Sequence, residues 1–348
     1  DSRFRTPDYG AALYHESTYD AGRWRFTAGL RVDFEASKLH YRSYAEATYT
    51  TQTPDGTSYP HAILVDQPGT LKQSFTEILP KISVLYRMGS SRRNTLYATV
   101  SKGYKAGGFN TQMFSDVLQQ QVMKQMGFGS LYDVADVVTY KPEKSWNYEV
   151  GAHLSTPSHK VQADLALFYI DCRDQQLTVF PEGQVTGRLM TNAGRTRSFG
   201  EASLLATLWR NLDLQVAYGY TRATFVKFDT GKADYAGNFI PYAPQHTLYA
   251  GASYTLRTGW NWLEYVIFRV AANGAGRIYW NEANTFSQPF YALLEASIRF
   301  EHRHWAVDVW GRNLTDTRYD TFYFMSIGNS FLQRGRPRTF GVSLSITL

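Results

Sequence analysis

Residues Thr339–Leu348 read TFGVSLSITL, and the strict alternation of apolar and small residues in this stretch decides the fold. A period of two places alternate residues on opposite faces of a β-strand. One face carries Phe340, Val342, Leu344, Ile346 and Leu348, and the other carries Thr339, Gly341, Ser343, Ser345 and Thr347. Small polar residues suit a watery lumen better than a protein core. The stretch therefore predicts a strand of an all-β, transmembrane antiparallel β-barrel.

The same alternation recurs in most of the preceding segments. Phe290–Phe300 alternates Leu294, Ala296, Ile298 and Phe300 with Glu295, Ser297 and Arg299, and His304–Asp316 places Asp308, Trp310 and Arg312 opposite Trp305, Val307 and Val309. A charge at mid-depth in lipid costs roughly 2–4 kcal/mol, so the charged faces should line the lumen. Further strands are predicted around Trp24–Val32, Ile82–Met88, Trp146–Leu154, Val161–Tyr169, Leu212–Tyr220 and Leu248–Leu256. Tyr9–Tyr19 and Trp262–Trp280 alternate poorly and are placed by position alone.

The predicted connections fall into two classes. Short turns are expected near Asp20–Gly22, Gly89–Arg93, Thr156–Ser158, Arg210, Arg257–Asn261 and Glu301–Arg303. Long loops are expected near Ser43–Lys72, Gly108–Pro142, Phe180–Arg188, Phe228–Ala243, Asn281–Pro289 and Arg318–Arg336. Short turns at one rim and long loops at the other are typical of bacterial outer-membrane barrels, whose long loops lie outside the cell.

The composition supports a barrel and excludes several other classes. Aromatic residues make up 16% of the chain, as suits a wall with two membrane interfaces. No run approaches the roughly 18 apolar residues of a spanning helix. The net charge of +6 is scattered, without a basic helix or an RNA-binding motif, so no nucleic-acid partner is expected. We interpret Cys172 as a small residue inside a strand. No nucleophile elbow, phosphate loop or zinc signature is present, so the chain is not expected to be an enzyme, and no metal site or cofactor is expected.

The strand count indicates an incomplete wall. About thirteen strands are predicted over residues 1–348, whereas single-chain bacterial barrels usually have an even number. An open sheet edge in lipid leaves backbone groups unpaired. We therefore expect one partial barrel domain. It is either the C-terminal part of a larger barrel or a wall that a partner chain closes.

Six local stretches, in order, resemble TonB-dependent outer-membrane receptors, and the resemblance spans nearly the whole chain. They are Ala28-Gly-Leu-Arg-Val-Asp33, Leu79-Pro-Lys-Ile-Ser83, Tyr97–Asn110 (YATVSKGYKAGGFN), Glu143–Gly151 (EKSWNYEVG), Asn313-Leu-Thr-Asp316 with Tyr319, and Gly335–Gly341 (GRPRTFG). The terminal Leu348 departs from the aromatic residue with which the family commonly ends. The plug domain and the TonB box of the family are not recognised in the sequence.

The resemblance implies active uptake of a scarce nutrient. In that family a plug inside a barrel of about 22 strands is displaced when TonB, energised by ExbB and ExbD, pulls on the TonB box. A ferric siderophore is the first choice of ligand, because Ser101–Asn110 looks like the siderophore-receptor branch. Vitamin B12, an oligosaccharide or another chelate stays open as the ligand. A passive porin-like channel or a structural or adhesion barrel would be a different class. Expected partners are the TonB–ExbB–ExbD complex, lipopolysaccharide, and the remaining barrel and plug.

Recognition is expected in the outer loops, because binding groups concentrate on loops that a rigid scaffold positions. Aromatic faces and cations suit a large anionic chelate. The candidate contacts are Tyr104, Lys105, Phe109, Tyr319, Tyr323, Phe324 and Arg334. For any one of these aromatic residues, packing of the rim is the competing interpretation. Gly103, Gly107 and Gly108 are expected to allow a tight backbone or a positive φ, and Asn313 and Asp316 to form a side-chain-to-backbone turn.

Overall fold

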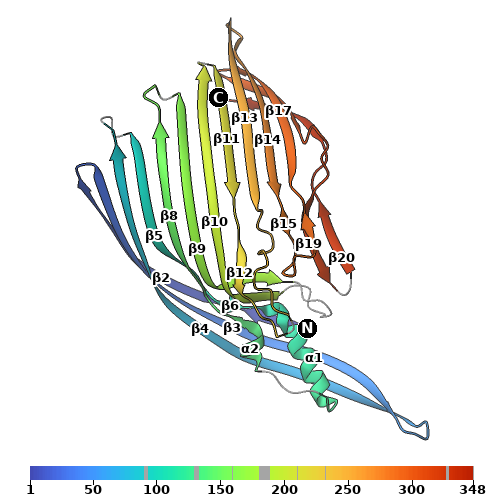
Figure 1. Cartoon of the computed structure of the whole chain (residues 1–348). Coiled ribbons are helices and arrows are strands. Elements are labelled where there is room, and N and C mark those ends of the chain that lie inside the picture. Colours follow the sequence, from blue (N-terminus) through green and yellow to red (C-terminus); the bar gives the residue numbers. More distant parts are fainter. Residues whose placement is uncertain are drawn as a thin grey trace.

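The computed structural model describes residues 1–89, 93–128, 133–158, 160–179, 189–209, 211–231, 233–326 and 329–347. Within these ranges the chain forms one 15-stranded antiparallel sheet, three small two-stranded sheets and a few short helices. Figure 1 shows the large sheet curling into an open trough whose strands run up and down in chain order. The predicted all-β barrel wall is confirmed. No helix within the described ranges has the length and apolar character needed to cross a membrane.

The strands of the wall follow one another along the sheet. In hydrogen-bonded order they are β1 (Ser2–Arg5), β3 (Trp24–Gln52), β4 (Ser58–Met88), β5 (Asn94–Lys105), β8 (Glu143–Ser155), β9 (Val161–Val179), β10 (Leu189–Trp209), β11 (Leu212–Tyr220), β13 (His246–Trp260), β14 (Leu263–Gly276), β17 (Tyr291–His302), β18 (Trp305–Arg312) and β21 (Thr339–Ile346). β2 (Asp8–Ala21) also pairs with β3, and β12 (Thr224–Lys227) also pairs with β10. β2 follows β1 along the same edge of β3, and β12 follows β11 along the same edge of β10. Strands β2 and β14 occupy the two segments that were placed by position alone.

The connections contain the remaining elements. They are β6 (Gly108–Phe109), η1 (Thr111–Met113), α1 (Phe114–Gln125), α2 (Val134–Val138), β7 (Thr139–Tyr140), β15 (Ile278–Tyr279), β16 (Ser287–Gln288), β19 (Asp320–Ser326) and β20 (Asn329–Arg334). All of them lie at one end of the trough, which we call the long-loop end (Figure 1). The opposite, short-turn end carries the tight turns.

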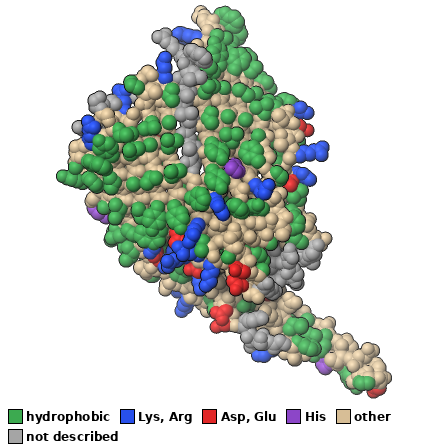
Figure 2. Space-filling model, in the orientation of Figure 1, with side chains coloured by type: hydrophobic (Ala, Val, Ile, Leu, Met, Phe, Trp, Pro, Cys, Tyr) green, Lys and Arg blue, Asp and Glu red, His purple; other side chains and the backbone are tan. Residues whose placement is uncertain are grey.

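The two faces of the wall differ as the alternation predicts. Phe340, Val342, Leu344 and Ile346 on β21 are 70%, 69%, 64% and 66% exposed on the outer face. Ser343 lies on the inner face, where its Oγ accepts a hydrogen bond from Trp310 Nε1 at 3.1 Å. Figure 2 shows rows of hydrophobic side chains across the outer face. The predicted register of the final strand is confirmed.

The predicted loop Ser43–Lys72 is wrong, because this segment is a hairpin. β3 and β4 pair without interruption from Trp24↔Tyr86 to Gln52↔Ser58, and only Thr53–Thr57 forms the turn. Pro60 and Pro68 suggested a loop, but they lie where β4 pairs with β3 on one side only, since the β4–β5 ladder ends at Lys81↔Ser101. A proline is tolerated on such an edge because its missing N–H has no ladder partner there.

Two predicted turns are displaced by a few residues. β13 continues to Trp260, so the turn predicted at Arg257–Asn261 lies at Asn261–Trp262, after a register shift that includes Gly259 at φ 78°. β17 continues to His302, so the turn predicted at Glu301–Arg303 lies just beyond that residue. The predicted loop Phe180–Arg188 lies outside the described residues.

The loop predicted at Gly108–Pro142 folds onto the long hairpin. Its helices bury Phe114, Val117 and Val138 against Leu39 of β3, in a cluster that Tyr41 and Leu71 complete. Phe114 is 1% exposed, and its ring centroid lies 4.5 Å from that of Tyr41. Burial of large aromatic area is the main source of stability in so small a cluster. The hairpin and the helices therefore form one packed unit beyond the wall.

Several glycines lie where an aromatic ring covers the neighbouring strand. Gly151 pairs with Tyr97, and Gly341 pairs with Trp310. A Cβ at Gly151 would lie 2.5 Å from the Tyr97 ring, and one at Gly341 would overlap the Trp310 ring. Both rings therefore lie flat against the inner face of the wall, in the aromatic–glycine packing that stabilises designed sheets.

Candidate functional site

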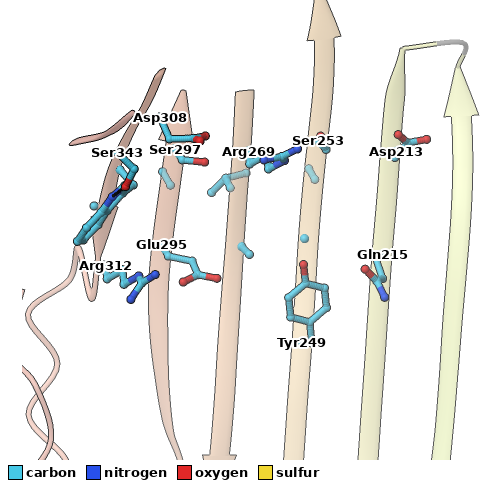
Figure 3. A pocket seen from close by; sticks show the side chains of 17 residues that line it. Asp213, Gln215, Tyr249, Ser253, Arg269, Glu295, Ser297, Asp308, Arg312 and Ser343 are labelled. Carbon is cyan, nitrogen blue, oxygen red and sulfur yellow. Dashed lines mark hydrogen bonds between the residues drawn. The ribbon is translucent and has the colours of Figure 1, made fainter. Parts of the chain in front are cut away.

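The inner face of the C-terminal strands carries a polar hollow of about 530 Å³. Figure 3 shows that its side chains project from β11, β13, β14, β17, β18 and β21 toward a common space. The labelled lining residues are Asp213, Gln215, Tyr249, Ser253, Arg269, Glu295, Ser297, Asp308, Arg312 and Ser343. Acids and bases alternate over this surface, so it suits a hydrated or protein-filled lumen rather than an apolar ligand.

The period of two predicted only part of this hollow. Glu295, Ser297, Asp308, Trp310 and Arg312 were assigned to the inner face, and all five line the hollow. The guanidinium of Arg312 lies 4.8 Å from the centre of the Trp310 ring, which fixes the cation in a cation–π contact.

The sequence reasoning missed the residues of the hollow on β11, β13 and β14. Arg269 is the cation among them, and it pairs directly with Ser253 and Ser297 across the sheet. The poor alternation of Trp262–Trp280 concealed it. The pairing of Arg269 with Ser297 could have revealed that Arg269 lies on the inner face, because Ser297 is predicted to lie there.

A second group of rings lies at the long-loop end. We call it the aromatic cluster, and it contains Tyr242, Trp280, Phe286, Phe322 and Tyr323. The ring of Tyr242 lies 5.5 Å from the rings of both Trp280 and Phe322, and the Phe286 and Tyr323 rings are 4.7 Å apart. The Tyr242 hydroxyl donates to the Tyr323 carbonyl oxygen at 3.1 Å. Burial raises the pKa of Tyr242 to about 12, with a further contribution from the charge of Glu282, so the hydroxyl stays a donor at neutral pH.

Four predicted contacts lie on or beside the β19–β20 hairpin. Tyr323 is 7% exposed in the aromatic cluster, and Phe324 stacks on Phe331 at 4.9 Å. Tyr319 stacks on Tyr291 at 4.4 Å, at the base of the hairpin. Arg334 pairs with Asp320 at 3.2 Å while its side chain stays 66% exposed. Three of the four therefore pack the loop, and Arg334 keeps a cation at its surface.

The other three predicted contacts lie near the helical loop. Phe109 packs against the Phe114 cluster, and Tyr104 is partly buried with no hydrogen-bond partner for its hydroxyl. Lys105 is exposed at the end of β5, where β8 pairs with it through Glu143. The structure thus brings the seven residues together as two groups on different loops.

Gly107 and Gly108 allow Tyr140 to approach the backbone closely. A Cβ at Gly107 would lie 2.5 Å from the Tyr140 carbonyl oxygen, and one at Gly108 would overlap the Tyr140 hydroxyl. The alternative expectation of a positive φ is wrong for these two residues and for Gly103, whose Cβ would lie 2.5 Å from Ser145 Oγ. The tight approach lets the loop after β5 pass against β7.

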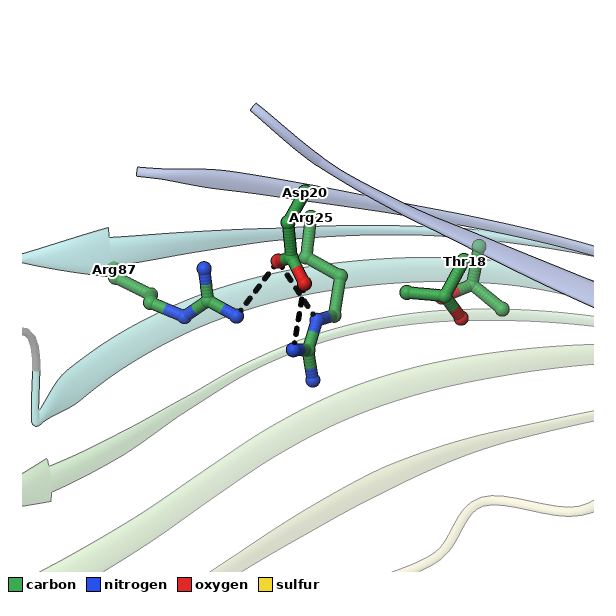
Figure 4. A network of polar contacts seen from close by, with 5 residues as sticks. Thr18, Asp20, Arg25 and Arg87 are labelled. Carbon is green, nitrogen blue, oxygen red and sulfur yellow. Dashed lines mark hydrogen bonds and ion pairs between the residues drawn. The ribbon is translucent and has the colours of Figure 1, made fainter. Parts of the chain in front are cut away.

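The short-turn end is tied by an ion network. Arg25 donates to both carboxylate oxygens of Asp20 at 3.0 and 2.9 Å, and Arg87 donates to Asp20 Oδ1 at 2.8 Å. Figure 4 shows the two guanidinium groups converging on this carboxylate from neighbouring strands. The network joins β2, β3 and β4 beside their turns, and we assign it a structural role.

A curved antiparallel wall with an apolar outer face, a charged inner face and folded loops at one end defines part of a transmembrane β-barrel. The profile of the family described as "TonB dependent receptor-like, beta-barrel" matches residues 1–314. The chain belongs to this family of transport receptors, which are not enzymes.

The relatives that the chain resembles are longer proteins. The pesticin receptor of Yersinia pestis is 26% identical over 281 residues, which are 79% of this chain and 37% of that protein. The crystal structure of the ferric yersiniabactin uptake receptor FyuA from Yersinia pestis matches with a TM-score of 0.71 and 21% identity, over 99% of this chain and 46% of that one. The ferric-catecholate import receptor Fiu from E. coli K12 matches at 0.64 and 16%, over 99% and 45%. The chain therefore spans less than half the length of each of these proteins.

Proposed function

We propose that this chain is wall and loops of an outer-membrane active transporter that takes up a ferric siderophore. The observation that carries the proposal is the long-loop end of a family barrel, where aromatic rings and exposed cations gather on folded loops. Aromatic faces and cations bind a large anionic iron chelate through stacking and charge. Arg334 and Lys105 supply the exposed cations among the predicted contacts.

The proposed transport cycle needs parts that the described wall does not supply. The charged hollow around Arg269 and Glu295 would face a plug domain, in the same polypeptide or a partner chain. TonB, energised by ExbB and ExbD, would pull on that plug and release the ligand into the lumen. The wall would hold the loops rigid, so that ligand binding on the outside can be coupled to movement of the plug.

The names of the relatives support iron as the cargo. One relative is a pesticin receptor, and two similar structures are receptors for ferric yersiniabactin and for ferric catecholates. All three proteins are named as receptors, and two of the names describe the uptake or import of a ferric chelate. We therefore place a ferric siderophore ahead of vitamin B12 or an oligosaccharide.

The test is uptake of radioactive iron by cells that carry the full-length receptor as their sole siderophore receptor. A panel of ferric catecholate, phenolate and citrate complexes is supplied under iron limitation, with and without functional TonB. We expect TonB-dependent accumulation of one of these complexes. Accumulation that persists without TonB, together with steady large currents in planar bilayers, would establish a passive porin instead. Uptake of labelled vitamin B12 or maltodextrin would change the ligand and keep the transporter.

The loop residues are tested in the same receptor. Replacement of Lys105 and Arg334 together by Ala should weaken binding of the ferric complex about tenfold or more, because each cation contributes a modest amount to binding. The control is Arg42→Ala with Lys72→Ala, which removes two cations from the β3–β4 hairpin. Unchanged affinity in a normally assembled double variant would remove Lys105 and Arg334 from the binding site.

A further inference from the structure

The ladder between β5 and β8 ends at the pair Lys105↔Glu143, at the base of the helical loop. The residue that precedes β8 is Pro142, which has no N–H group to continue the ladder. β6 and β7 form a second ladder, which begins at Gly108↔Tyr140. The backbone carbonyl groups in the gap between the two ladders therefore need hydrogen-bond donors from elsewhere in the fold.

Two amide side chains from the neighbouring strands supply these donors, and we call them the amide clamp. They are Gln176 of β9 and Asn192 of β10, which pair with each other across the sheet. Gln176 is 9% exposed, and its Nε2 donates to the carbonyl oxygens of Ala106 and Lys141 at 2.6 and 3.2 Å. A longer bond, of 3.5 Å, reaches the carbonyl oxygen of Lys105. Asn192 binds both the carbonyl oxygen and the N–H of Lys141, at 2.9 and 2.8 Å, so the clamp holds both stems of the loop.

The main chain of Gln176 also affects the charge beside Lys105. Lys105 and Glu143 lie directly opposite each other, where side chains of opposite charge are close enough to pair. The Glu143 carboxylate instead accepts a hydrogen bond from Gln176 N at 2.8 Å. Both residues belong to the part of the chain that the structure describes, and no ion pair joins them there. Lys105 therefore remains an exposed cation on a backbone that is held from two sides.

We propose that Gln176 is a positioning residue for an anionic ligand, because it holds Lys105 in a fixed place and leaves its ammonium group unpaired. The inference rests on the proposed function, in which Lys105 is a ligand contact. A cation on a fixed backbone loses less conformational entropy on binding than one on a mobile loop. An unpaired ammonium group also binds an anionic chelate without first giving up a carboxylate partner.

The test is a double-mutant cycle in the purified full-length receptor, titrated with ferric tris-catecholate, which is a trianion. Gln176→Met keeps the length of the side chain and removes its donor, so binding should weaken about threefold and no more than on Lys105→Ala. Gln176→Met should have no further effect in the Lys105→Ala background. It should keep its full effect in the Arg334→Ala background, because Arg334 lies on β20. The matched control is Gln175→Met, which changes the neighbouring amide on the opposite face of β9 and should bind as wild type.

Hydrogen exchange of the ligand-free receptor tests the clamp itself. Exchange in residues 104–108 and 139–143 should rise in Gln176→Met and stay unchanged in Gln175→Met. Unchanged exchange in Gln176→Met would overturn the proposal, and so would a loss of affinity that persists in the Lys105→Ala background. Equal affinity of Gln176→Met and a wild type that binds the chelate would refute the role of Gln176 alone. A wild type that binds neither ferric tris-catecholate nor ferric citrate would instead refute the proposed function, so the two failures are distinguishable.

Discussion

Asn313 shows how one side chain can close a loop onto a barrel strand. It is 5% exposed and adopts φ 49°, just after β18. Its amide nitrogen donates to the carbonyl oxygens of Thr317 and Arg336 at 3.0 and 3.1 Å, and its oxygen accepts from Thr317 N at 2.8 Å. Asp316, at φ 51°, accepts from Arg338 N at 3.0 Å. The predicted side-chain-to-backbone turn is confirmed, and it fixes both ends of the β19–β20 loop.

We expect Asn313→Ala to destabilise the assembled receptor by about 2–4 kcal/mol, because three hydrogen bonds are lost and alanine is strained at a positive φ. The measurement is the urea midpoint of unfolding in detergent. Thr315→Ala is the control, since this exposed hydroxyl contacts only that of Thr317, at 2.8 Å. Equal midpoints for both variants would contradict the assigned role of Asn313.

Single residues were predictable where their chemistry is local. The turn at Asn313 depends largely on Thr317, four residues away, and Cys172 lies inside β9, as predicted, at 5% exposure. Asp133 is a further local case, because its carboxylate caps α2 by accepting from Ala135 N at 2.9 Å. The packed rings of Tyr319 and Tyr323 depend on Tyr291 and Phe286, which are distant in sequence, so their partners could not be predicted.

At the scale of elements, strand β21 sets the register of the C-terminal wall. In a Cys172→Ala background of the full-length receptor, Ser343→Cys should react with a membrane-impermeant maleimide that enters the lumen. Val342→Cys should be protected by lipid, because its side chain lies on the opposite face and is 69% exposed there. Reaction of Val342→Cys alone would reverse the assigned faces.

The helical loop is held to the long hairpin by one small core. Phe114→Ala should cost about 3–5 kcal/mol of local stability and release α1, because Phe114 is 1% exposed between Tyr41 and Phe4. Hydrogen exchange should rise in α1 and at the tip of β3–β4 while β13 and β14 stay protected. Met123→Ala on the exposed side of the same helix is the control. Protection that is unchanged by Phe114→Ala would mean that other contacts hold the loop.

Strands were predictable inside the wall and not beyond it. Within the wall, one apolar and one polar face produce the period of two, as in Val342 and Ser343. Beyond it, the β3–β4 hairpin has the helical loop on one face and solvent on the other, so polar residues and Pro60 occur on a true strand. Ile63 and Val65 are buried apolar residues of this hairpin, at 5% and 4% exposure, but two residues are too few to establish an alternating pattern in the sequence.

At the scale of the whole molecule, the sheet order runs from β1 to β21 without pairing these two strands to each other. We expect residues 1–348 expressed alone to give no heat-modifiable monomer on a gel, because two edges would expose unpaired backbone groups to lipid. Co-expression with the remaining barrel strands is the control and should restore the band. A folded monomeric band from residues 1–348 alone would show that the wall can close on itself.

The overall architecture was largely predictable, because the dyad pattern and the turn spacing act along the entire chain. The binding arrangement was not, since loops from distant parts of the sequence meet only in the folded state. Lys105 and Arg334 illustrate the difference, because their residue types suggested a role, whereas their places at the ends of β5 and β20 depend on the fold.

The rings that lie flat over Gly151 and Gly341 also set the free width of the passage. Each glycine leaves a notch in which Tyr97 or Trp310 rests, so these large side chains take little cross-section from the bore. A larger residue at Gly151 or Gly341 would push the ring of Tyr97 or Trp310 into the lumen, where it would narrow the passage. Such a receptor would still assemble and still capture its cargo at the mouth, yet the cargo would leave the barrel more slowly. These two small residues therefore determine how far two of the large inner-face side chains extend from the wall.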